Sequence, residues 1–234
     1  MHRFVVWPSV ALVMLGALAR PAVAQEDARP TVAVMYFNDG AIGASHAELE
    51  PLSGGIADLL ITELSSNPGI RVVERDNLKK LMDEQSLGAG GRVDKETAVR
   101  MGRILGARHM IFGGFVTDGR GTMRLDARAV NVETSEIEHV ESVQGKQDNL
   151  MTLIDDLAAK LNKGMKLPDI PKPVREANAA TAKKVPFQAA MLYSRALAAK
   201  DGGNKAEAVQ LLQKSLASFP EYAPAKRELE KMGQ

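Results

Sequence analysis

The alternation of apolar and polar residues along the chain predicts strands and helices in turn from residue 31 onward. The run Thr31–Phe37 is continuously apolar and rich in β-branched residues, which is typical of a strand buried on both faces. Leucine and isoleucine then recur at helical spacing through Leu52–Ser65, and the turn residues that follow Ser66 end this helix. The segment Ile70–Val73 is predicted to be the next strand.

Two more helices are predicted, each with an aspartate near its start. Asp76 is placed to cap the first of them, because a side-chain carboxylate accepts hydrogen bonds from the free backbone N–H groups of a first helical turn. Asp94 is placed to cap the second, and Gly106 to end it in a left-handed conformation. The second helix is expected to bury four apolar side chains: Val99, Met101, Ile104 and Leu105.

The following region has the period of two that is typical of strands with one buried face. Apolar and charged residues alternate strictly from Met123 to Ala129, between the predicted strands Met110–Val116 and Ile137–Val143. Their short connections make these strands antiparallel, and a helix over Asn149–Leu167 closes the region. This order of elements predicts an α/β fold, in which helices flank a mixed sheet.

The C-terminal part of the chain is predicted to be helical. The stretch Pro168–Pro186 contains four prolines and no hydrophobic period, so we expect a linker that is extended near its start. Three helices follow over Phe187–Lys200, Lys205–Phe219 and Ala223–Met232. The predicted domains are therefore an α/β domain over residues 31–167, a linker over 168–186 and a small all-α region over 187–234.

Residues 1–24 have the order of a secretory signal peptide: a basic start, an apolar run, and the small-x-small motif Ala22-Val23-Ala24. We expect cleavage between Ala24 and Gln25, after which residues 25–30 lead into the first strand. The apolar run is too short to span a bilayer of about 30 Å, and no integral membrane segment is expected after cleavage. The predicted location is the periplasm, either free or peripheral to the outer membrane.

Composition excludes several classes of function. The chain has 30 lysines and arginines against 29 aspartates and glutamates, and a protein that binds nucleic acid through bulk charge needs a larger basic excess. It has no cysteine, which excludes disulfides, thiolate nucleophiles, iron–sulfur clusters and a lipid anchor on cysteine. Its single tryptophan, Trp7, lies in the predicted signal peptide. We therefore expect no nucleic-acid partner and no cofactor.

The histidines do not form the pattern of a metal site. His46 falls in a predicted loop, and His109 and His139 fall in two different predicted strands. None of them has a second histidine four residues away or a carboxylate at ligand spacing, whereas a zinc site needs about three convergent ligands. We expect His46 to be solvated and the other two to be residues of the sheet.

Other chemistry-bearing residues also favour structural roles. The glycine-rich stretch Gly88–Arg92 lacks the Gly-Lys-Ser/Thr ending of a phosphate-binding loop, so we expect a flexible turn. The carboxylate pairs Glu48/Glu50 and Asp155-Asp156 are expected to be solvated. Asn38-Asp39-Gly40 follows the first strand, at the edge where open α/β sheets bind ligands, but such triplets are also common in turns. The sequence has no Gly-x-Ser-x-Gly nucleophile motif, and we predict no catalytic, cofactor-binding or metal-binding residue.

Four segments, in this order along the chain, carry a family resemblance. They are VAVMYF at 32–37, GGIADLLITEL at 54–64, IRVVERDNLKKLMDEQ at 70–85 and VDKETAVRMGRILGARHMIFGGFVTD at 93–118. Together they resemble the curli secretion-channel (CsgG-type) family, which implies a mixed α/β fold and a role in envelope assembly or secretion rather than catalysis. The channel-forming members add long amphipathic hairpins and a lipidated cysteine. Here Ser86–Val93 is too short for a barrel hairpin, so we expect a soluble domain that forms no pore.

Residues 187–234 resemble a tetratricopeptide repeat followed by a capping helix. Six residues fall where that repeat places its core, turn and terminal positions: Ala196, Gly203, Ala208, Leu212, Leu216 and Pro220. One repeat alone leaves apolar surface exposed, so we expect it to pack on its capping helix, on the α/β domain or on a second chain.

Three functions stay open on the sequence. In the favoured one, a periplasmic accessory or scaffold protein binds other envelope proteins in curli-type assembly or secretion. It would use the concave side of its C-terminal helices, or add a partner strand to Ile137–Val143 or Ile70–Val73, whichever the fold leaves unpaired. The second is a homo-oligomeric ring of α/β domains at the outer membrane. The third is a small-ligand binder or enzyme that uses Asn38–Gly40.

Overall fold

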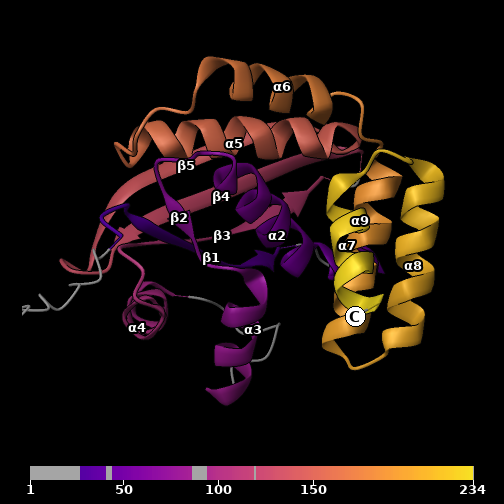
Figure 1. Cartoon of the computed structure of the whole chain (residues 1–234), viewed down its shortest axis with the longest axis horizontal. Coiled ribbons are helices and arrows are strands. Elements are labelled where there is room, and N and C mark those ends of the chain that lie inside the picture. The colour runs from indigo at the N-terminus through magenta and orange to yellow at the C-terminus, as the bar shows by residue number, and fades with distance from the viewer. Residues whose placement is uncertain (1–26, 41–43, 86–93, 119, 234) are drawn as a thin grey trace, which may run out of the picture.

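The computed structural model describes residues 27–40, 44–85, 94–118 and 120–233 of the chain. A mixed sheet with the strand order β2-β1-β3-β4-β5 forms its centre (Figure 1). β1 pairs in parallel with β2 and β3, whereas the pairs β3–β4 and β4–β5 are antiparallel. The predicted α/β fold with a mixed sheet is therefore confirmed. The strands are β1 (Thr31–Asp39), β2 (Arg71–Val72), β3 (His109–Thr117), β4 (Thr122–Asn131) and β5 (Glu136–Lys146).

Two predicted features lie outside the described residues: the signal peptide with its cleavage site at Ala24 and Gln25, and the glycine-rich turn Gly88–Arg92. Both stay predictions.

Helices pack on the two faces of the sheet to different extents. α2 (Leu52–Ser65) packs against β1 and α5 (Leu150–Gly164) against β5, whereas α4 (Lys95–Leu105) packs against β3 (Figure 1). A Cβ placed on Gly145 of β5 would touch the Leu153 side chain of α5 at 3.0 Å, and one on Gly102 of α4 would touch Met110 of β3 at 2.6 Å. The strand register places Gly145 and Met110 on opposite faces of the sheet, so α4 lies on the face that α5 does not cover.

The helix α3 (Arg75–Glu84) starts one residue earlier than its predicted cap. Glu74 occupies the N-cap position and makes no side-chain hydrogen bond there, so the prediction that Asp76 caps this helix is wrong. Asp76 instead lies inside the first turn, where its carboxylate accepts hydrogen bonds from Lys200 Nζ at 3.0 and 3.2 Å.

The ends of α4 follow the prediction, and so do the predicted buried residues Val99 and Met101, but Ile104 does not. Asp94 accepts a hydrogen bond from the backbone N–H of Thr97 at 2.8 Å, and Gly106 ends the helix with φ 63°. Ile104, however, is 55% exposed, so its predicted burial is wrong. The reason is that α4 rests on the sheet through Gly102, and a residue two positions further along a helix lies on nearly the opposite side.

Two segments near the first strand also differ from the prediction. Asn38 and Asp39 belong to β1 rather than to a turn, because pairing with Gly114 and Phe115 of β3 continues the ladder to Asp39. His46 lies in the short helix α1 (Ala44–Leu49) and not in a loop.

The predicted linker contains a helix, α6 (Lys172–Ala182), so the expectation of an irregular linker over Pro168–Pro186 is wrong for these residues. Pro171 occupies its N-cap and Pro173 lies in its first turn, where a missing N–H costs no helical hydrogen bond. α6 packs against α5, and Asn178 Nδ2 donates a hydrogen bond to Ser66 Oγ at 2.9 Å (Figure 1).

The last three helices are α7 (Phe187–Asp201), α8 (Lys205–Ser218) and α9 (Ala223–Gly233), close to the predicted ranges. α7 and α8 pack together, and Ser215 Oγ donates to the Ala189 carbonyl at 2.8 Å. α7 also packs on α2, so the helical region is attached to the α/β part of the chain (Figure 1). Of the predicted repeat residues, Ala196, Ala208 and Leu212 are buried, Leu216 is half-buried, Gly203 has φ 80° and Pro220 is exposed just after α8. Their assignment to a tetratricopeptide repeat stays a prediction.

Candidate docking surface

The face of the sheet that carries α4 is open along β4 and β5. Arg124 and Arg128 of β4 are exposed, and their partners in the register, Gln144 and Val140 of β5, are exposed on the same face. The apolar residues that alternate with them in β4 point to the other face and are buried, as the period of two predicts.

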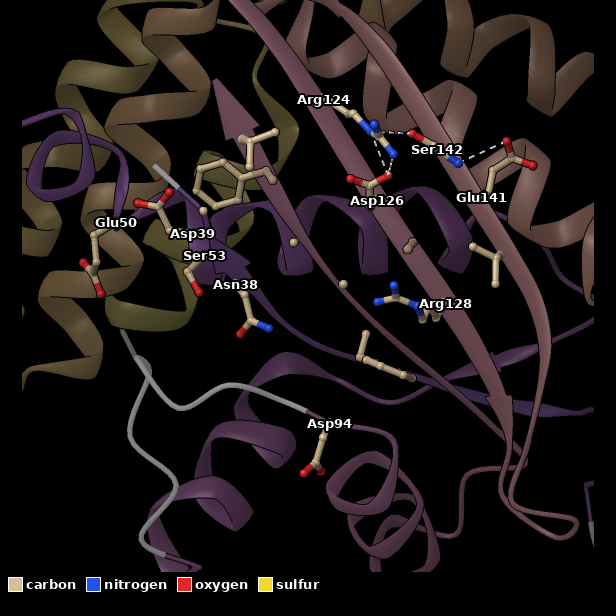
Figure 2. Close-up of a pocket in the computed structure, with 18 of the residues that line it drawn as sticks. Asn38, Asp39, Glu50, Ser53, Asp94, Arg124, Asp126, Arg128, Glu141 and Ser142 are labelled. Atoms are coloured by element: carbon tan, nitrogen blue, oxygen red, sulfur yellow. Dashed lines mark hydrogen bonds and ion pairs between the residues drawn. The ribbon is translucent and has the colours of Figure 1, made fainter. Parts of the chain in front are cut away.

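A cavity of ≈ 810 Å³ lies over this open face, and Figure 2 shows the side chains that line it. Its floor is formed by β3, β4 and β5. Asn38 and Asp39 at the end of β1 and Ser53 of α2 border it on one side, and Asp94 at the start of α4 borders it on another. The cavity therefore lies at the carboxyl end of β1, where Asn38-Asp39-Gly40 was predicted as one alternative binding position.

The two arginines on the floor of this cavity, Arg124 and Arg128, differ in their partners. Arg124 Nη2 donates to Asp126 Oδ1 at 2.7 Å, and Arg124 Nε also donates to Ser142 Oγ at 3.1 Å (Figure 2). Arg128 has no hydrogen bond or ion pair with any of the described residues. An arginine offers five N–H donors in a planar fork that suits a carboxylate or phosphate. Arg128 is thus a cation that is available to a partner.

Exposed large apolar side chains gather on the same side of the sheet. Among the described residues they are Ile104 (55% exposed), Val116 (42%), Ile137 (44%) and Val140 (59%). In the register, Val116 pairs with Arg124, Val140 with Arg128, and Ile137 with Val130, which places all three on the face that carries α4. We call the surface formed by Val116, Ile137 and Val140 together with Arg124 and Arg128 the α4-side surface. Ile104 is not part of it, because it lies on the side of α4 that faces away from the sheet.

β5 is a free edge strand with a bulge. The register shifts between Ala129 and Val130 of β4, so Glu138 has no Cα partner across the ladder. Its carboxylate instead meets His109 Nδ1 at 2.5 Å. A bulge and charged side chains are two ways in which proteins protect an exposed edge from pairing with another strand. Both predicted candidates for strand addition lie at sheet edges, but β2 has two residues whereas β5 has eleven.

Comparison with known proteins identifies the α/β part of the chain. Residues 17–120 match the model of the family described as curli production assembly/transport component CsgG. Over these residues, which make up less than half of the chain, the protein is similar to that family. The matched residues end in the turn between β3 and β4, so β4, β5, α5 and the C-terminal helices lie beyond them. The search among curated proteins found no match.

Three solved structures are similar to about half of this chain. The LpoB C-terminal domain from Salmonella enterica is 16% identical, with a TM-score of 0.39, over 50% of this chain and 82% of that one. The LpoB C-terminal domain from Escherichia coli is 17% identical, with a TM-score of 0.35 over the same shares. Lipoprotein GNA1162 from Neisseria meningitidis is 12% identical, with a TM-score of 0.37, over 50% of this chain and 79% of that one.

Within the described residues, no helix of the protein has both the length and the apolar character that crossing a bilayer requires.

Each histidine that the structure describes lies close to the carboxylate of an aspartate or a glutamate. His46 Nδ1 lies 2.9 Å from Asp39 Oδ2, and His139 Nε2 lies 3.4 Å from Glu141 Oε2. With His109 and Glu138 there are three such pairs, none of which sequence spacing alone indicated. The described part of the chain contains no group of three or more potential metal ligands.

The predicted carboxylate pairs differ in their surroundings. Asp156 is exposed and lies 3.5 Å from Lys160 Nζ, as expected for a solvated residue. Asp155 is only half-exposed, and its pKa is raised by burial and by the charge of Asp156. Glu50 borders the cavity at the start of α2. In that cavity, no hydrogen bond joins Ser53 to His46 among the described residues, so the geometry contains no serine–histidine pair.

A buried ionic cluster joins the α/β part of the chain to the C-terminal helices. The Arg75 side chain is 2% exposed, and its Nη1 donates to Tyr36 Oη at 2.6 Å and to Asp201 Oδ2 of α7 at 2.7 Å. Tyr36 in turn donates to Asp201 at 2.9 Å. Tyr193 of α7 donates to Asp58 of α2, which lies 3.6 Å from Arg75 Nε. The cluster therefore links α2, α3 and β1 to α7.

Burial governs the protonation of this cluster. It raises the pKa of Asp58, against the opposing effects of the Tyr193 hydrogen bond and the Arg75 charge. It also raises the pKa of Tyr36, so that this phenol stays neutral and can donate to Asp201. Because a buried charge left without its partner is strongly unfavourable, Arg75 and Asp201 hold each other in place.

Proposed function

We propose that the protein is an exported accessory protein of the cell envelope, located in the periplasm, which acts by binding other envelope proteins and catalyses no reaction. Two sequence observations support export and an envelope role: the predicted signal peptide and the match of residues 17–120 to the CsgG family. The observation that carries the proposal is the α4-side surface. Its exposed Val116 and Val140 line the same cavity, and exposed apolar side chains that are grouped among polar ones favour an interaction site.

In this proposal the C-terminal helices are a structural part of the protein rather than its recognition surface. None of the large apolar residues that are exposed in the described part of the chain lies in α7, α8 or α9. The apolar side of α7 packs against α2 and α8. The sequence-based proposal that the concave side of these helices binds a partner is therefore less well supported than a site on the sheet.

The proposal is tested by treating cells that express a tagged, full-length protein with an amine-reactive cross-linker, and purifying it from the periplasmic fraction. We expect an N-terminus at Gln25 and at least one cross-linked envelope protein. Retention in the cytoplasm, or a periplasmic protein without any cross-linked partner, would contradict the proposal. Deletion of residues 187–234 is not a suitable control, because it would expose the side of α2 that contacts α7.

A ring of CsgG-like domains is a second candidate, favoured by the free edge of β5. In such a ring the sheet edges or flanking helices of neighbouring copies would meet head to tail. Sedimentation velocity of the purified protein at tens of micromolar distinguishes the ring from the accessory protein. A closed oligomer favours the ring, and a monomer favours the accessory protein.

A further inference from the structure

The helix α6 is held on the rest of the protein by few side chains. It lies along α5, on the side of α5 that faces away from the sheet (Figure 1). Of its eleven residues, Ala182 is buried, and Val174, Asn178 and Ala179 are half-buried. Asn178 donates to Ser66 Oγ of the α2 C-cap at 2.9 Å. An element that buries so little apolar surface opens more readily than the core of the protein.

The chain is fixed on both sides of α6. Before the helix, the carbonyl of Pro168 accepts hydrogen bonds from Asn67 Nδ2 at 2.8 Å and from Asn162 Nδ2 at 3.1 Å. After the helix, Val185 is 6% exposed, and α7 begins at Phe187. α6 is therefore a strap, by which we mean a weakly held helix between two fixed points.

The strap borders a polar cleft of ≈ 510 Å³ that also involves α2 and α9. Asn178 lines the cleft from α6, Glu63 from α2 and Arg227 from α9. Glu63 and Asp155 of α5 are both half-buried. Neither carboxylate forms an ion pair within the described part of the chain, and Arg227 Nη2 donates to Thr62 Oγ1 at 3.3 Å instead. The strap thus lies over acidic groups that no close cation neutralises.

We propose that α6 is a pH-sensitive strap, which is closed while the Glu63 carboxyl is neutral and opens when this carboxyl is ionised. A carboxylate that is buried without a cation is unfavourable, and opening of the strap gives it water. The two fixed ends stay in place, so the C-terminal helices remain attached through the cluster of Arg75 and Asp201. This inference does not depend on the partner or on the docking surface proposed above.

The groups around Glu63 come from several packed elements. Burial opposes ionisation of the carboxyl, and so does the negative charge of Asp155 on α5. A hydrogen bond from Asn178 of α6 and the charge of Arg227 on α9 favour the ionised form. Burial is the largest of these effects, and the pKa of Glu63 is raised from 4.5 to about 7.

The sign of the pH dependence follows from this shift. Since the pKa of Glu63 is higher in the closed state than in water, the protonated carboxyl favours closure. This contribution is complete below about pH 4.5 and is lost as pH rises through about 7. The strap is therefore closed in acid and opens as the pH rises above neutrality.

The remaining charged groups near the strap do not replace Glu63 in this role. Arg175 and Lys183 of the strap favour the ionised form of Asp155, whereas burial and the charge of Asp156 raise its pKa. The Tyr222 phenol is 2% exposed, and burial raises its pKa, so it stays neutral near Glu63. The other carboxylates of the cleft each have a partner. They are Asp58 with Tyr193, Glu228 with Lys200 and Glu74 with Lys231.

A single introduced thiol can report on the strap, because the chain has no cysteine. Ala182→Cys places the thiol on the buried side of α6, and Ala208→Cys places it in α8 at a fully buried position, as the reference for global unfolding. The purified protein reacts with a maleimide at pH 5.5 and at pH 8.5. Each rate is divided by that of a short peptide with the same cysteine, so that the ratio measures exposure and not the thiolate fraction.

We expect the ratio for Ala182→Cys to exceed that for Ala208→Cys by at least about ten-fold at both pH values. It should also rise by at least about ten-fold between pH 5.5 and 8.5. Glu63→Gln, which keeps the shape of the side chain without its charge, should reduce this rise to less than about two-fold. Glu230→Gln, at an exposed position of α9, is the matched control and should leave the rise unchanged.

Three outcomes overturn the proposal. Equal ratios at the two thiols assign the exposure to global unfolding rather than to a strap. A ratio for Ala182→Cys that does not change with pH, or that rises as much with Glu63→Gln as without it, removes the role of Glu63. If circular dichroism shows that a cysteine variant is not folded, amide hydrogen exchange of α6 relative to α8, in the parent and in Glu63→Gln, makes the same comparison at the same two pH values.

Discussion

The contact between α2 and α7 depends on one glycine, and an alanine there should weaken the attachment of the C-terminal helices. A Cβ on Gly55 would lie 1.9 Å from Ser194 Oγ, 2.5 Å from Ser194 Cβ and 3.2 Å from Ser194 Cα. Rotation of the serine hydroxyl relieves only the first of these contacts. The other two involve atoms that follow the backbone of α7, so the helices must move apart.

The expected magnitude follows from two opposing effects. Forced separation of packed elements costs about 1–3 kcal/mol, whereas alanine is favoured over glycine within a helix by about 1 kcal/mol. We therefore expect Gly55→Ala to lower the free energy of unfolding by up to about 2 kcal/mol. Gly54→Ala is the matched control, because it gains the same helix propensity and its Cβ would meet only the Tyr36 ring, at 3.2 Å. It should change stability by less than about 1 kcal/mol.

Urea unfolding followed by circular dichroism measures both variants and a rescue. Ser194→Gly removes the Cβ and Oγ that the methyl group introduced by Gly55→Ala would strike. The double variant should therefore regain most of the Gly55→Ala loss relative to Ser194→Gly alone. Such a double-mutant cycle isolates the coupling between the two positions. Equal stability of Gly54→Ala and Gly55→Ala, or a cycle without coupling, would refute the close packing of α7 on α2.

Three further predictions concern the core, a titrating carboxylate and the ionic cluster. Leu60→Ala removes a fully buried side chain and should lower the free energy of unfolding, measured thermally, by about 2–5 kcal/mol. Ile104→Ala removes a side chain that is 55% exposed and should cost less than about 1 kcal/mol. Equal losses would contradict the orientation of α4. Burial, with the charge of Asp155, raises the pKa of Glu63 from 4.5 to about 7. Folding therefore favours the protonated carboxyl of Glu63. The stability that this protonated group contributes is lost as pH rises from about 4.5 through 7. Glu63→Gln should consequently be more stable than the parent in urea by about 1–2 kcal/mol at pH 8 and not at pH 4, and a constant difference between these pH values would exclude this titration. Arg75→Met, which leaves Asp201 and Asp58 without their buried cation, should cost about 3–5 kcal/mol in urea unfolding, and a loss below about 1 kcal/mol would show that the cluster does not hold α7.

Local patterns in the sequence predict most of the elements of this fold. The helix α2 has the predicted bounds, because its leucines and its terminating Asn-Pro-Gly turn both act within a few residues. The cap at Asp94 and the left-handed Gly106 were predicted for the same reason. α6 was missed because its two prolines were taken to exclude a helix, whereas at a helix start they are tolerated.

The parts that sequence patterns did not predict depend on contacts between distant residues. The exposure of Ile104 follows from which side of α4 meets the sheet, and helical spacing alone does not fix that side when apolar residues are spread around it. The ionic contact of Arg75 with Asp201 joins residues 126 positions apart. The α4-side surface is likewise formed by β3, β4 and β5 together. Its alternating residues and its solvated face were predicted, but its position beside α4 and the end of β1 was not.

Site-specific photo-cross-linking in living cells tests the central claim most directly. A benzophenone amino acid replaces Val140 on the α4-side surface in one strain and Gln213 on α8 in another, both in the full-length protein. The account predicts that the probe at position 140 is cross-linked to an envelope protein and that the probe at position 213 is not. Cross-linking from position 213 alone, or from neither position, would contradict the claim that this CsgG-like domain recognises a partner through its open sheet face.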